Sequence, residues 1–184
     1  ASAGGVGQPP ELDEWSRAVH AELIDRLAQW GAAAIVFDMS FEAQRDADDD
    51  RRLADSIRRA GNVVLFERVV SERLEVPGRV PAGVAEIETR VPPLPLLKEA
   101  AWASAPFVLP RVPVRVNQFW TFGRSLGAVP TLPVVALQAY LAPHYETLVG
   151  ALAAMAPEAV DGLPLTETEL RGADLEAGIQ KLRD

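Results

Sequence analysis

The chain contains no cysteine, which excludes disulfides, a thiol nucleophile and thiolate metal ligands. It has only two histidines, His20 and His144, and neither has a second histidine at the spacing of a metal-binding pair. No apolar run approaches the roughly 18 residues that a transmembrane helix needs. We therefore expect any membrane anchor to lie outside this sequence.

A phosphate-binding motif is missing as well. The glycine-rich stretch 4–7 follows no strand and precedes no Lys-Ser/Thr pair. The 26 acidic residues outnumber the 18 basic ones, so the net charge of -8 opposes binding to nucleic acid. The sequence predicts a non-catalytic protein without a cofactor, a metal site or a nucleic-acid partner.

The composition of the chain is that of one folded domain. Apolar residues make up 48% of the 184 positions, enough for a real core. We expect a single domain over 1–184, with a flexible lead-in over 1–10 and a polar C-terminal helical segment over 157–184, opened by a capping box at Thr166 and Glu169.

The first half of the chain predicts a βαβ unit. A helix from Trp15 to Trp30 is followed by Gly31, and apolar runs at 33–38 and 62–66 are typical of parallel strands covered on both faces. Between them, 46–60 has acids at its start and arginines at its end, as a helix dipole favours. The residues expected on the buried face of the first helix are Trp15, Val19, Leu23, Leu27 and Trp30.

The second half predicts shorter elements, and the whole reads as an α/β fold with a largely parallel sheet flanked by helices. We expect Val134, Val135, Leu137 and Leu141 to face inward. The predicted elements are an edge strand at Val84–Val91, a short helix at Leu96–Ala103, a strand at Val112–Val116, and helices at Leu132–Leu141 and His144–Ala156.

Asp38 is the most interesting acid, because it ends a predicted parallel strand, where open α/β sheets bind ligands. Arg68 follows the second strand in the equivalent place. The alternatives for Asp38 are a binding residue, a turn cap, or the carboxylate of a small α/β hydrolase. We interpret His20 as a partly buried structural histidine, and the acids of 46–50 as a solvated helix start in preference to a cation site.

Five segments together resemble a known family, the CHASE type-two sensory domain, the second of the cyclase/histidine-kinase-associated extracellular sensor families. Their order and spacing are more specific than any one of them. The segments are Trp15–Leu27, Gly31–Asp38, Arg59–Leu65, Arg111–Trp120 and Pro130–Gln138.

The resemblance implies an extracytoplasmic sensory domain of a bacterial transmembrane protein, attached to membrane helices outside this sequence and controlling a cytoplasmic cyclase or kinase. It implies an unknown small ligand, and a homodimer is an open alternative. The candidate ligand-binding residues within the matching segments or at strand ends are Arg17, His20, Asp38, Arg68 and Asn117.

Two departures from the family pattern stand out. The strand that usually precedes the first helix and the closing strand are not found here, so we expect the sheet to lack its first and last strands. Ser16 stands where the family's tryptophan is commonly followed by proline, which is a small change at a helix start.

Overall fold

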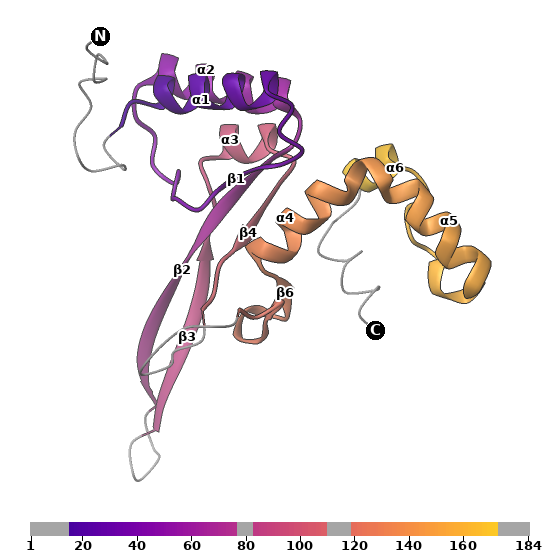
Figure 1. Cartoon of the computed structure of the whole chain (residues 1–184). Coiled ribbons are helices and arrows are strands. Elements are labelled where there is room, and N and C mark those ends of the chain that lie inside the picture. Colours follow the sequence, from indigo (N-terminus) through magenta and orange to yellow (C-terminus); the bar gives the residue numbers. More distant parts are fainter. Residues whose placement is uncertain (1–14, 77–82, 110–118, 173–184) are drawn as a thin grey trace.

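The computed structural model describes residues 15–76, 83–109 and 119–172 (Figure 1). The predicted strand at Val112–Val116 and the candidate residue Asn117 lie outside these ranges, as do the lead-in 1–10 and residues 173–184. In chain order the elements are α1 Arg17–Gln29, β1 Ile35–Phe37, α2 Ala47–Ala60, β2 Val63–Val76, β3 Gly83–Val91, α3 Pro95–Ala100, β4 Ala103–Pro106, β5 Phe122–Gly123, η2 Arg124–Leu126, β6 Val129–Pro130, α4 Leu132–Leu141, η3 Ala142–His144, α5 Tyr145–Met155, η4 Pro157–Val160 and α6 Glu167–Gly172.

The central sheet is built on β2. Its first residues pair in parallel with β1 on one side and with β4 on the other, so the predicted βαβ unit is confirmed. Its remaining length pairs with β3 in an antiparallel hairpin that runs from Arg68↔Val91 to Val76↔Gly83. The α/β fold class is therefore confirmed, and the sheet is mixed because β3 adds antiparallel pairing to the parallel strands.

Helices cover both faces of this sheet (Figure 1). Val63 and Leu65 point to one face, where they join a core with Ile24 of α1 and Leu53 of α2. Val64 points to the other face, where it packs in a second core with residues of β4 and α4. Successive residues of β2 thus feed two cores, as the alternation of a strand requires.

The predicted buried face of α1 was partly wrong, although Leu27 does pack against the core. Arg17, His20, Ala21 and Ile24 are buried, whereas Leu23 is exposed and Trp30 is 76% exposed. The buried residues repeat at spacings of three and four, but the seam begins on a charged residue and not on an apolar one. The physical reason is that Arg17 has a charged partner on α2, so burying it does not leave an isolated charge.

Two other predictions of burial were partly wrong. Val36 is exposed, because β1 is an edge strand and α4 packs over β2 and β4. On α4, Val135 is buried as expected, but Leu137 and Leu141 are exposed. In both places the side chains are apolar, but the neighbouring elements do not extend far enough to cover all of them.

The ends of α2 show why the helix begins and stops where it does. Asp46 accepts hydrogen bonds from the backbone N–H groups of Asp48 and Asp49 through Oδ1, at 3.0 and 2.9 Å. Gly61 closes the helix with φ at 69°, a left-handed conformation that favours glycine. The predicted helix of 46–60 is confirmed nearly residue for residue.

The C-terminal helices α5 and α6 extend away from the sheet (Figure 1). The Tyr145 hydroxyl of α5 donates to the Pro164 carbonyl at 2.8 Å, which ties α5 to the segment that leads into α6. The Thr166 hydroxyl accepts from the Glu169 N–H at 3.1 Å, so the capping interaction predicted for α6 is present. Among the described residues, no helix is both long and apolar enough to cross a membrane.

Candidate functional site

A buried ion pair joins the first residue of α1 to α2. Arg17 Nη1 lies 3.0 Å from Asp50 Oδ1, and each side chain is only 3% exposed. The two atoms are close but poorly aligned for a hydrogen bond, and Arg17 Nε also has no hydrogen-bond partner among the described residues. The site therefore contains a buried guanidinium with unused donor capacity.

The same guanidinium binds the segment that follows β1. Arg17 Nη2 donates to the Ala43 carbonyl at 2.6 Å, and its carbon Cζ lies 5.3 Å from the centre of the Phe41 ring. That arrangement places the cation against an aromatic face, which is favourable when water is excluded. Burial lowers the pKa of Arg17 and the charge of Asp50 opposes the shift, so the side chain stays a cation at physiological pH.

His20 lies one turn further along α1, against the same aromatic residues. Its ring meets Phe41 and Phe37 edge to face, with centroids 5.4 and 6.0 Å apart. Nδ1 lies 3.2 Å from the Ser16 carbonyl, which can only accept, so Nδ1 carries the proton and Nε2 is the acceptor nitrogen. Burial lowers the pKa of His20, and Arg17 and Arg45 act in the same direction. The ring is neutral at neutral pH.

The segment 38–46 has no regular structure, and side chains of neighbouring elements hold it in place. The Arg45 N–H donates to Asp50 Oδ2 at 3.0 Å, and Arg45 Nη1 donates to the Trp15 carbonyl at 3.2 Å. The Phe41 carbonyl accepts from the Leu94 N–H at 2.8 Å. Because few backbone bonds fix the segment, a change in these side-chain contacts would move it.

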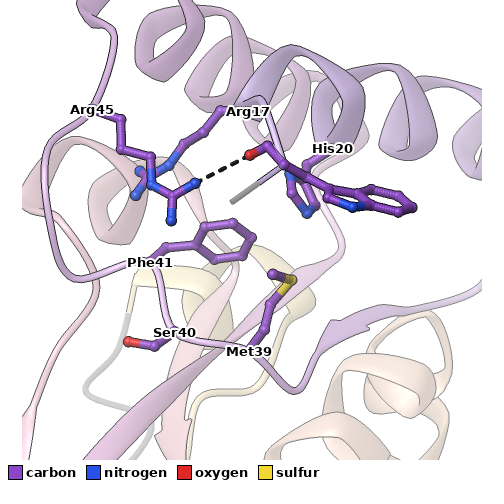
Figure 2. Close-up of a pocket in the computed structure, with 7 residues that line it drawn as sticks. Arg17, His20, Met39, Ser40, Phe41 and Arg45 are labelled. Carbon is purple, nitrogen blue, oxygen red and sulfur yellow. Dashed lines mark hydrogen bonds between the residues drawn. The ribbon is translucent and has the colours of Figure 1, made fainter. Parts of the chain in front are cut away.

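A small cavity lies at the centre of this arrangement (Figure 2). Its volume of about 10 Å³ is at the lower limit of what one water molecule needs. A larger ligand fits only if a wall of the cavity moves. The lining residues are Trp15, Arg17, His20, Met39, Ser40, Phe41 and Arg45.

The structure brings two of the five predicted site residues together. Arg17 and His20 both line this cavity. Asp38 follows β1 directly and is exposed, and it is not among the lining residues. Arg68 lies on the surface, where Nε and Nη2 donate to the two carboxylate oxygens of Glu42 at 2.8 and 3.0 Å. This bidentate hydrogen bonding lowers the pKa of Glu42.

Sequence reasoning missed Asp50, which it assigned to a solvated helix start. The carboxylate is 2% exposed and paired with Arg17, so this assignment was wrong. The sequence does contain a signal, because Asp50 lies three and seven residues before the buried Leu53 and Ile57. It therefore sits on the apolar seam of α2, and an acid on such a seam requires a buried partner.

A second buried carboxylate, Glu67, lies on β2 near the carboxyl ends of the parallel strands. The Ser104 hydroxyl donates to Glu67 Oε1 at 2.6 Å, and Arg90 Nη1 lies 3.5 Å from Oε2. Lys98 Nζ is 3.9 Å from Oε1. These contacts tie β4, β3 and α3 to β2, so we interpret Glu67 as a structural connection.

The hydrolase alternative finds no support around Asp38. Within 15–76, 83–109 and 119–172, no three His, Asp or Glu side chains are grouped as metal ligands would be. Asp38 makes no hydrogen bond or ion pair with another residue of those ranges. The polar chemistry that the structure assembles lies at Arg17 and Asp50.

Comparison with protein families gives a match to the CHASE2 domain over residues 6–173. The curated proteins and the solved structures gave no match. The match covers most of the chain and agrees with the resemblance of the sequence segments. The chain therefore belongs to the CHASE2 domain family, whose members are extracellular sensory domains of signalling proteins.

Proposed function

We propose that this chain is the extracytoplasmic input domain of a bacterial transmembrane protein, and that it controls a cytoplasmic cyclase or kinase. The observation that carries the proposal is the family match over residues 6–173. In this proposal the domain is anchored by membrane helices outside this sequence. Its ligand shifts the domain between two conformations, and the membrane helices transmit that shift.

The cavity beside Arg17 is where we place the ligand. Leaving a buried donor unpaired costs about 1–3 kcal/mol, so the unused Arg17 Nε favours an incoming acceptor oxygen. Arg45 adds a second guanidinium to the same wall (Figure 2). Guanidinium groups bind carboxylates through two parallel hydrogen bonds, so the ligand class is a small carboxylate.

Binding would act on the segment 38–46. A carboxylate bound to Arg17 competes with the Ala43 carbonyl, and one bound to Arg45 competes with the Trp15 carbonyl. Loss of these contacts frees the segment, because they are among the few that hold it. The ion pair thus holds the segment in the closed conformation, and the ligand favours an open one.

A thermal-shift measurement with acetate, succinate and citrate tests the site. A carboxylate that binds only the folded chain raises its melting temperature by mass action. Arg45→Gln should abolish this increase, whereas Arg58→Gln, on the exposed part of α2, should retain it. If no carboxylate raises the melting temperature, or if Arg45→Gln responds like the parent chain, the site is misplaced.

The wider proposal is tested separately, by the parent gene. Translated sequence before Ala1 and after Asp184 should encode at least one apolar segment long enough to span a membrane. The translated sequence of the parent gene should also contain a cyclase or kinase domain. A parent gene with no apolar segment on either side would overturn the extracytoplasmic placement, whatever the thermal shifts show.

A further inference from the structure

Apolar and small side chains form an exposed row along α4, η3 and α5. Within α4 and within α5 the exposed positions repeat at spacings of four or three, so they share one face of each helix. Leu137 is 56% exposed, Leu148 is 50% exposed and Met155 is 85% exposed. We name this row the 137–155 stripe, and its residues are Leu137, Leu141, His144, Leu148, Ala151 and Met155.

The stripe contains a hollow as well as projecting side chains. Figure 1 shows α4 and α5 meeting at an angle, and a groove of about 460 Å³ is lined there by Leu141, His144, Thr147, Leu148 and Ala151. Leu137 lies one turn before this groove and Met155 one turn after it. A surface that carries both a hollow and exposed apolar side chains can pair with a copy of itself.

Helices with so few charged residues are usually packed against another part of a protein. Glu146 is the only Asp, Glu, Lys or Arg between residues 132 and 156. A helix that is apolar all round belongs in a core or an interface, and a row of large exposed apolar side chains marks an interaction site. Yet α5 belongs to neither core of the described residues.

The charge distribution indicates what kind of partner binds the stripe. The chain carries a net charge of -8, so most surfaces brought against their own copy would repel it. The stretch 132–156 avoids this penalty, because it carries one charged residue. It contains no Lys or Arg to attract an anionic membrane, and one acid is too few to attract a basic partner.

We propose that the 137–155 stripe is the interface of a homodimer of this chain. The two copies pair the same surface across a two-fold axis, so that side chains of one stripe enter the groove of the other. The inference does not depend on the identity of the ligand. It assigns an interaction surface to helices that lie away from the cavity at Arg17.

Analytical ultracentrifugation of the chain tests the interface. We expect a monomer–dimer equilibrium for the parent chain below about 100 µM. Leu148→Glu places two like charges in the symmetric interface, so the dimer dissociation constant should rise at least about a hundredfold. Ile87→Glu is the matched control, because Ile87 is an apolar residue of β3 that is 48% exposed and lies off the stripe. It should dimerise like the parent chain.

A parent chain that stays monomeric at every concentration overturns the proposal. So does a dimer that Leu148→Glu leaves intact. A melting temperature lowered by Leu148→Glu, with the parent monomeric, would instead show that another part of this chain covers the stripe.

Discussion

Arg17 and Asp50 are both charged and both buried, so each depends on the other. Asp50→Asn leaves the Arg17 guanidinium without a counter-ion in the core, and we expect a loss of roughly 3–5 kcal/mol in the free energy of unfolding. Asp55→Asn breaks an exposed pair on the same helix, with Arg58, and should cost at most about 1 kcal/mol. Urea unfolding measures both variants. Equal losses would show that the Arg17 pair is no more important than a surface contact.

The buried side chain of His20 should make the stability of the chain depend on pH. Burial lowers its pKa in the folded chain, below the ordinary value of 6.5 that the unfolded chain keeps. As pH falls below 6.5, the unfolded state takes up a proton that the folded state does not yet accept. The free energy of unfolding should therefore decrease from pH 7.5 toward pH 5.5. This window lies above the range in which Glu42, with its lowered pKa, titrates.

Urea unfolding at several pH values checks this slope. His20→Asn should flatten it, since no imidazole then titrates in the core. A slope that survives His20→Asn would assign the pH dependence to another group.

Sequence reasoning named only some of the residues around this cavity, for a physical reason. Arg17 and His20 were chosen as candidate site residues, and both line the cavity. Asp50 was missed, because residues 33 positions apart give no local sign that they pair. An acid in a cluster of acids at a helix start looks like a response to the helix dipole. Only its position on the apolar seam of α2 distinguishes it from Asp48 and Asp49.

Among the elements, α2 depends on its first capping residue. Asp46→Ala removes the acceptor for two backbone N–H groups, so we expect a loss of about 1 kcal/mol in the free energy of unfolding. Asp48→Ala is the control, because that side chain is solvent-exposed and does not cap. It should cost only a few tenths of a kcal/mol. A matching loss in both variants would mean that general negative charge, and not the cap, stabilises the helix start.

The elements that sequence reasoning found are those with a strong local signal. The strand–helix–strand unit from Ile35 to Phe66 combines apolar runs with capped helix ends, and each sign agrees with the others. By contrast, β4 at Ala103–Pro106 was not predicted, and the helix predicted at Leu96–Ala103 overlaps it by one residue. This strand contains no β-branched or aromatic residue and ends in proline, so its strand conformation comes from pairing with β2 and not from propensity. The far half of β2 was likewise missed, because its charged residues hide the alternation.

At the scale of the whole molecule, the two cores and the C-terminal helices differ in how they are stabilised. Val63 and Leu65 of β2 belong to one core and Val64 belongs to the other, so the sheet and the helices packed on it should unfold together. The cavity at Arg17 lies on the side of α1 and α2, and the 137–155 stripe lies on α4, η3 and α5. A signal from one to the other would pass through β2, which touches both cores.

Hydrogen exchange measures this difference directly. In α5 only Tyr145 and Val149 are buried, and neither joins a core, so the helix can open without disturbing the sheet. We expect amides of α5 to exchange at least about 100-fold faster than those of Val63–Leu65 when the chain is dilute and monomeric. Raising the concentration should slow exchange in α5 and leave β2 unchanged, because dimer formation covers only the stripe. Equal protection in the dilute monomer would show that α5 and the sheet are one cooperative unit, held by contacts that the two cores do not include.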